Sequence, residues 1–180
     1  MKKRIISILL ALALVLGTFG GLTVRAAERN LALNRPATAS SVANDCGPEL
    51  AVDGVTAGPQ WNSENMKNGT VADDAPQNEQ WLQVDLGASG ATISQIKLWY
   101  NMKVWPMVYR IETTDTPADA ASWKTVVSVS RPSRNGFVWN GEGQNIADEA
   151  SNTDTITLSS SPKLERTELQ RYVRIYIEKV

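Results

Sequence analysis

The stretch Trp81-Leu82-Gln83-Val84-Asp85-Leu86 decides the fold class of this chain. Leu82, Val84 and Leu86 alternate with Trp81, Gln83 and Asp85, so apolar side chains recur at a period of two. That period predicts a β-strand with one buried face, and Gly87 predicts the end of the strand.

The same alternation recurs in short segments along the rest of the chain. The predicted strands are residues 93–100, 107–113, 123–130 and 172–178, with shorter candidates at 136–139 and 155–158. Clusters of Gly, Pro, Asn and Ser separate these segments, and only residues 48–52 and 117–122 favour a helical turn. Short strands divided by turn residues are typical of an all-β sandwich or jelly roll.

The composition excludes several kinds of chemistry. The chain has 180 residues, of which 18 are basic, 19 are acidic, one is cysteine and none is histidine. The lack of histidine excludes a Ser-His-Asp or Cys-His nucleophile and, with a single cysteine, the usual zinc ligand set. Cys46 has no intrachain disulfide partner, and the sequence does not assign it a role. Any metal is therefore expected to be a hard cation held by oxygen.

Residues 1–27 are typical of a signal peptide. Residues 2–4 are Lys-Lys-Arg, residues 5–16 are almost wholly apolar, and Val24-Arg25-Ala26 approximates a small-x-small cleavage site. The alternative is an uncleaved anchor, because residues 5–24 are long enough to cross a bilayer. We favour cleavage, so the protein is expected to be secreted, either extracellular or associated with a cell surface.

The remaining segment, residues 28–180, has a length that suits one domain. Removing residues 1–27 takes away four basic residues and no acidic one, so 14 basic and 19 acidic residues remain, a formal net charge of −5. A negative balance argues against nucleic acid as a partner and against binding to, or insertion into, an anionic membrane.

Five motifs occur in the order found in one known family. They are residues 30–41 (NLALNRPATASS), residues 51–54 (AVDG) followed by Trp61, residues 80–87 (QWLQVDLG), residues 109–112 (YRIE) and residues 171–176 (RYVRIY). Over residues 30–180 the chain resembles the factor 5/8 type C, or discoidin-like, domain, and it is most similar to the family 32 carbohydrate-binding modules. The resemblance implies a single galactose-binding-like β-sandwich. The family normally adds a strand bearing an acidic residue after the one that matches residues 171–180, so the sandwich is expected to lack its last strand and the domain to be C-terminally incomplete.

The resemblance also implies a function. Such modules are non-catalytic and target a secreted glycoside hydrolase or an adhesin to galactose- or N-acetylhexosamine-type glycans. A glycan ligand and covalently linked catalytic or binding modules are therefore the expected partners. The alternative is a cell-adhesion module, or a protein- or lipid-binding one, on the same fold. Paired acids at 73–74, 148–149 and 165/168 lie in polar stretches, where nothing predicts the raised pKa of a general acid.

A structural calcium ion is the cofactor that the resemblance implies. The matching Asp-Gly turn of the family binds calcium with a carboxylate, a hydroxyl and nearby carbonyl oxygens. The corresponding ligands here are the Asp53 carboxylate, the Thr56 hydroxyl and the carbonyls of Leu50 and Val55. The alternative is an Asp-Gly turn in which the Asp53 side chain bonds its own backbone.

Sugar recognition requires a flat aromatic surface and polar groups, and the family reads sugars with loops at one end of the sandwich. The loops in question are residues 42–47, 61–80, 100–107 and 131–140. The predicted ligand contacts are Trp105 with Asn101 and Lys103, Trp139 with Arg134 and Asn135, and the pair Asn44 and Asp45. The remaining tryptophans, Trp61, Trp81, Trp99 and Trp123, are interpreted as packing residues.

Overall fold

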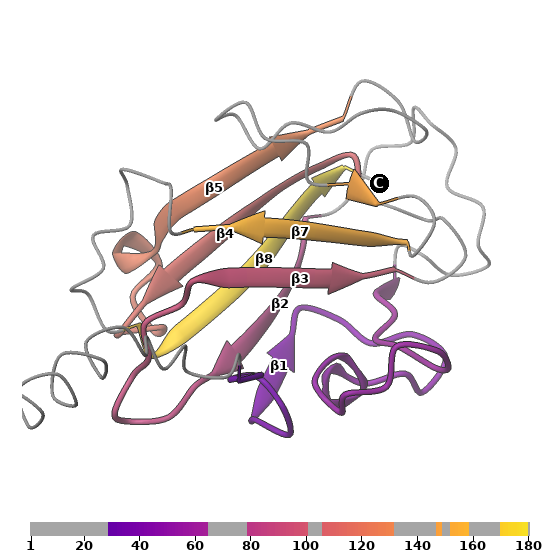
Figure 1. The fold of residues 1–180 in the computed structure, drawn as a ribbon, viewed down its shortest axis with the longest axis horizontal. Helices are drawn as coiled ribbons and strands as arrows, with labels where there is room; N and C mark the ends of the chain where they lie inside the picture. The colour runs from indigo at the N-terminus through magenta and orange to yellow at the C-terminus, as the bar shows by residue number, and fades with distance from the viewer. Residues whose placement is uncertain are drawn as a thin grey trace, which may run out of the picture. The chain divides into compact units, whose positions relative to one another are not determined.

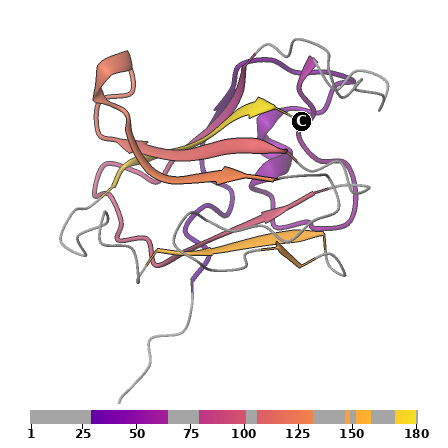
Figure 2. The same ribbon diagram turned by 90° about the horizontal axis from the view of Figure 1, so that it is seen from above.

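Two antiparallel sheets face each other in residues 31–180 (Figures 1 and 2). The computed structural model describes residues 29–64, 79–100, 106–131, 147–148, 152–158 and 170–179. The five-stranded sheet has the order β1 (Ala37–Ala39), β2 (Gln80–Asp85), β8 (Tyr172–Lys179), β4 (Val108–Thr114) and β5 (Lys124–Ser130). The three-stranded sheet has the order β3 (Gln95–Trp99), β7 (Thr153–Thr157) and β6 (Ala147–Asp148).

The predicted all-β sandwich is confirmed. Strands β2, β3, β4, β5, β7 and β8 fall within two residues of the predicted segments, whereas the sequence did not predict β1 or β6. Both predicted helical turns are present as the 3-10 turns η1 (Pro48–Ala51) and η3 (Ala120–Ser122). The strand candidate at 136–139 and the predicted export segment, residues 1–27, lie outside the described residues. Within the described part of the chain, no helix is long and apolar enough to cross a membrane.

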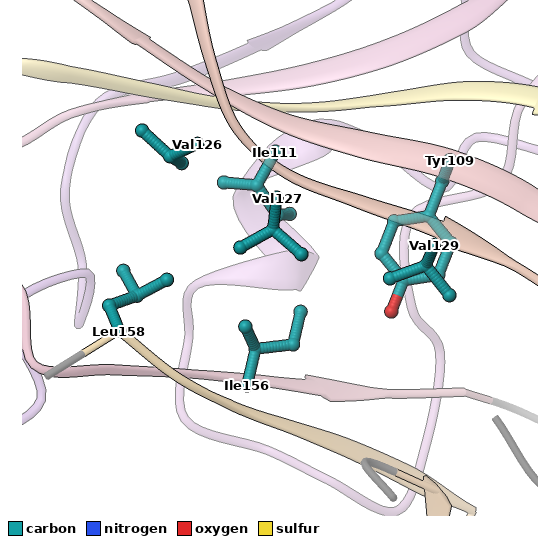
Figure 3. Close-up of a cluster of buried hydrophobic side chains, with 7 residues drawn as sticks. All are labelled: Tyr109, Ile111, Val126, Val127, Val129, Ile156 and Leu158. Atoms are coloured by element: carbon teal, nitrogen blue, oxygen red, sulfur yellow. The ribbon is translucent and has the colours of Figure 1, made fainter. Parts of the chain in front are cut away.

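The main core fills the space between the sheets. Five side chains of β4 and β5 point toward Ile156 and Leu158, which rise from β7 and the residue after it (Figure 3). Those five are Tyr109, Ile111, Val126, Val127 and Val129. Ile96 and Leu98 of β3 pack against the same cluster, so the alternation of β3 places these two residues inward. A second cluster beneath β2 joins Val52, Leu82, Val84 and Leu86.

The outer face of the five-stranded sheet is covered by its own charged and aromatic side chains. Glu112 is buried because the Nε and Nη2 atoms of Arg174 donate to its Oε2 at 2.9 and 2.6 Å, and the Nε of Arg110 donates to its Oε1 at 2.6 Å. The Arg174 guanidinium lies 3.9 Å from the centroid of the Trp123 ring, and that of Arg110 lies 3.8 Å from the Tyr176 ring. These contacts make Trp123 a packing residue, as expected.

An ion pair marks one end of this face, at the last residue of β2. The Nε and Nη2 atoms of Arg171 donate to the Asp85 carboxylate at 3.1 and 3.0 Å. These hydrogen bonds from Arg171 lower the pKa of Asp85 below its ordinary value. Because the folded state favours the ionised form of the Asp85 carboxyl group, the ion pair with Arg171 stabilises the fold above about pH 4. That stability is lost as the pH falls through the lowered pKa of Asp85.

The strand register defines the opposite end of the sandwich, which we call the loop end. Gln80 pairs with Ile177, and Val108 pairs with both Ser130 and Lys179, so β2 and β4 begin where β5 and β8 finish. In the other sheet Trp99 pairs with Thr153, so β3 finishes where β7 begins. Hydrogen bonds between the two sheets, described below, place these strand ends together.

Candidate functional site

The loops that were expected to read sugars all join the sandwich at the loop end. Residues 40–64 follow β1, whose last residue, Ala39, pairs with Leu82 near the start of β2. Three further segments also join the strands at the loop end. They are the segment before β2, the connection from β3 to β4 and the segment after β5. The turn between β6 and β7 joins them there. Five chain segments thus meet at one end, as a loop-built binding site requires.

A buried charged cluster joins the two sheets beneath these loops. Asp154 of β7 is 0% exposed, and its Oδ2 accepts hydrogen bonds from Tyr109 Oη at 2.7 Å, from Tyr100 Oη at 3.1 Å and from Arg131 Nη2. The side chain of Arg131 is also fully buried. Tyr109 belongs to β4 and Asp154 to β7, whereas Tyr100 directly follows β3 and Arg131 directly follows β5. The cluster therefore holds four chain segments together at one point.

The two tyrosines serve this cluster as hydrogen-bond donors. Burial, together with the charge of Asp154, raises the pKa of Tyr109 far above its ordinary value. Burial likewise raises the pKa of Tyr100. Both hydroxyls therefore stay protonated. Since Asp154 and Arg131 are sealed from solvent, the cluster can position the loops but cannot touch a ligand.

Arg131 also holds two of the predicted sugar-reading loops together. Its backbone N–H donates to the Met107 carbonyl at 2.7 Å, and its Nε donates to the Pro106 carbonyl at 3.0 Å. These bonds tie the C-terminal end of the 101–105 segment to the start of the 132–146 segment. Trp105, Asn101, Lys103, Arg134, Asn135 and Trp139 lie in those two segments, outside the described residues. Their roles stay predictions, but the residues that flank them lie side by side.

The first loop is held by a separate set of hydrogen bonds around Gln80. Ser40 Oγ donates to Gln80 Oε1 at 2.8 Å, and Ser41 Oγ donates to the same atom. Trp61 Nε1 donates to the Ser41 carbonyl at 3.0 Å, while the indole packs on the second core cluster. Trp61 is therefore a packing residue, as expected.

Asn44 and Asp45 form an exposed turn at the tip of that loop. Both take left-handed backbone angles, with φ of 56° and 55°, which asparagine and aspartate tolerate better than most residues. Both side chains are exposed. The neighbouring Cys46 is free and half-buried, and its Sγ lies 3.4 Å from the Asn44 carbonyl. The structure thus places Asn44 and Asp45 at the loop end, where a ligand can reach them.

The interpretation of Trp99 as a packing residue is wrong. Its side chain is 42% exposed, and it is the only aromatic residue among the large exposed apolar side chains of the described part of the chain. Alternation along β3 puts Trp99 in phase with the exposed Gln95 and Lys97 rather than with Ile96 and Leu98. Trp81, on the outer face of β2, is half-buried.

The expected calcium ligands lie within residues 50–56, on the connection from β1 to β2. Asp53 Oδ1 accepts the backbone N–H of Val55 at 2.8 Å, which is the self-bonded turn that was the alternative to a metal site. The Thr56 carbonyl is 3.4 Å from Gln60 Nε2, and Leu50 closes the η1 turn on the Gly47 carbonyl. Within the described ranges, no group of three or more acidic, histidine or cysteine side chains could hold a metal ion. Asp53 is thus the sole acidic side chain of the expected ligand set.

Asp154 and Arg131 are positioning residues that the sequence did not predict. A signal for Asp154 existed, because it stands in phase with Ile156 and Leu158 on a strand whose inner face is otherwise apolar. No comparable signal marked Arg131 as buried.

The two facing sheets, with five segments gathered at one end, define a β-sandwich. A model of the F5/8 type C domain family matches residues 36–180, so the chain belongs to this family. No curated protein sequence matches closely enough to show a relationship.

Several solved structures share the fold. Chitosan-binding module 1 of a chitosanase/glucanase from Paenibacillus sp. IK-5 has a TM-score of 0.56 at 23% identity, covering 84% of this chain and 88% of that one. Module 2 of the same enzyme, solved with chitotriose, has a TM-score of 0.54 at 24% identity, with 83% and 88% covered. The Clostridium perfringens module CpGH89CBM32-4, solved with GlcNAc-α-1,4-galactose, has a TM-score of 0.51 at 13% identity, with 87% and 84% covered.

Proposed function

We propose that this domain is a non-catalytic carbohydrate-binding module that binds a glycan at the loop end. The observation that carries the proposal is the buried cluster around Asp154, which fixes the flanks of the two tryptophan-bearing loops at the loop end. Pre-ordering several loops lowers the entropic cost of binding a small ligand. The saccharides bound by modules of similar fold support a sugar as the ligand.

Binding without catalysis fits the acids that the structure describes. A glycosidase needs two carboxyl groups that both reach the sugar. Asp154 and Glu112 are the acids most deeply buried, and each is paired with arginine beneath other side chains. We further propose that the protein is exported and that the module directs a linked enzyme, such as a glycoside hydrolase, or an adhesin to galactose- or N-acetylhexosamine-type glycans.

A glycan array probed with the purified protein tests this function. We expect signals confined to glycans that end in, or are built from, galactose or an N-acetylhexosamine. Sedimentation with phosphatidylserine vesicles serves as the control for the lipid-binding alternative and is expected to leave the protein in solution. Binding to vesicles with no signal on the array would replace the proposal with that alternative.

We also propose that any calcium bound by this domain is held at the Asp53 turn, with Thr56 and the carbonyls of Leu50 and Val55. Calcium at 100 times its Kd should stabilise the fold by about 2.7 kcal/mol, and Asp53→Asn should abolish this gain, because the neutral amide lacks the charge that the ion requires. Thermal unfolding with calcium and with a chelator measures both. Glu64→Gln, at an exposed acid outside the expected ligand set, is the matched control. A wild-type melting curve that calcium does not move would remove the cofactor.

A further inference from the structure

The outer face of the three-stranded sheet carries one exposed aromatic ring. Trp99 is the last residue of β3, an edge strand that lies beside β7 (Figure 1). Its side chain is 42% exposed, whereas Ile96 and Leu98 pack into the core on the opposite face. A tryptophan left this open at the end of a strand contributes little to the core, and its ring face is available for stacking on a ligand.

Polar side chains surround the indole in register. Thr153 pairs with Trp99, Thr155 with Lys97 and Thr157 with Gln95. Asp154 and Ile156 are fully buried, so the alternation of β7 turns the threonines to the outer face, where Thr155 and Thr157 are half-buried and reach solvent whereas Thr153 is buried. Facing residues on paired strands lie about 5 Å apart, and successive pairs on one face lie about 7 Å apart. The face is therefore a flat array of one indole with hydroxyl, ammonium and amide groups.

This composition selects among ligand classes. A protein or lipid partner requires a contiguous apolar patch, and among the described residues of this face the only large exposed apolar side chain is the single indole. A pyranose ring matches the face better, because it has an apolar C–H side that stacks on an aromatic ring and a rim of hydroxyls that take hydrogen bonds.

We propose that Trp99, with Lys97 and Thr155, forms a second saccharide-contact surface that recognises the continuation of a glycan chain. The inference rests on the proposed function. Tyr100, the next residue after Trp99, bonds Asp154 beneath the loop end, so the surface begins where the loop end finishes. From Trp99 to Gln95 it extends roughly 13 Å along β3. A terminal sugar held by the loops leaves the following units free to lie along this strand.

Chain-length dependence tests the inference directly. Calorimetric titrations would use N-acetylglucosamine and glucosamine, each as the monomer and as the β-1,4-linked hexamer. For the sugar that binds, the wild-type protein should prefer the hexamer. In Trp99→Ala the hexamer should bind about 3- to 10-fold more weakly, the size expected for one aromatic stacking contact. Monomer affinity should not change, and Trp99→Phe should recover part of the loss.

A matched control separates this effect from a general loss of structure. Trp123→Ala removes a tryptophan that directly precedes β5 of the other sheet, at the far end of the sandwich, and should leave the affinities for monomer and hexamer unchanged. Thermal unfolding should show that Trp99→Ala remains folded. Equal weakening of monomer and hexamer, or no change in either, would overturn the inference, as would a wild-type protein that binds none of the four sugars. The array decides the proposed function separately, so the two failures can be told apart.

Discussion

Replacing Asp154 with alanine is expected to lower the free energy of unfolding by about 3–5 kcal/mol. The substitution leaves the buried Arg131 guanidinium without its carboxylate and removes the acceptor of both tyrosine hydroxyls. Breaking a buried ion pair on one side costs far more than the pair itself contributes, because an uncompensated charge stays in the interior. Urea denaturation followed by tryptophan fluorescence measures the change.

Three further variants show whether charge or packing causes the loss. Asp154→Asn keeps the shape and one acceptor, so it should lose less than the alanine variant. The double variant Asp154→Leu with Arg131→Met removes both charges and should recover most of the lost stability. Glu64→Gln, at an exposed acid, should change stability by no more than about 0.5 kcal/mol. A loss below about 1 kcal/mol in Asp154→Ala would mean that the pair is not buried in solution.

Trp105→Ala is expected to weaken glycan binding at least about tenfold while leaving the fold intact. Trp105 directly precedes Pro106, whose carbonyl is held by Arg131 at the loop end. An aromatic ring that stacks on a sugar and is then truncated to alanine loses the whole stacking contact, which is typical of a residue that dominates binding. Calorimetry with the strongest glycan of the array gives the ratio of dissociation constants.

The second tryptophan-bearing loop supplies the comparison. Trp139→Ala should have the smaller effect if Trp105 provides the stacking surface. Unchanged binding in Trp105→Ala together with a large loss in Trp139→Ala would move the sugar to the loop that follows Arg131. Unchanged binding in both variants would contradict a loop-end site built on these two rings.

Most of the sandwich could be predicted because the buried faces of its strands carry large apolar residues at a period of two. Strand β1 was missed because Ala37, Thr38 and Ala39 are small or polar and show no such contrast. The pairing of β8 between β2 and β4, and the register shifts in β4 at Val108/Tyr109 and Ile111/Glu112, depend on contacts between distant segments. No local pattern encodes those contacts.

The candidate site could be predicted only in outline. Family resemblance indicated which loops to consider, and the register places those loops at one end. The Asp154–Arg131 pair joins segments of different sheets, so the sequence around either residue does not predict the pairing. The prediction for Trp99 relied on the general preference of tryptophan for burial. It ignored the alternation of β3, which puts Trp99 on the same face as Gln95 and Lys97. Local periodicity was the better guide at that position.

Nuclear magnetic resonance mapping of the bound glycan tests the central claim most directly. Titrating the isotopically labelled protein with the strongest array glycan should shift backbone amides at Asn44 and Asp45 and on either side of the 101–105 and 132–146 segments. Amides at the far end, around Gly87–Gly90 and Asp119–Trp123, should stay in place. Shifts confined to that far end under saturating glycan would contradict a saccharide site at the loop end.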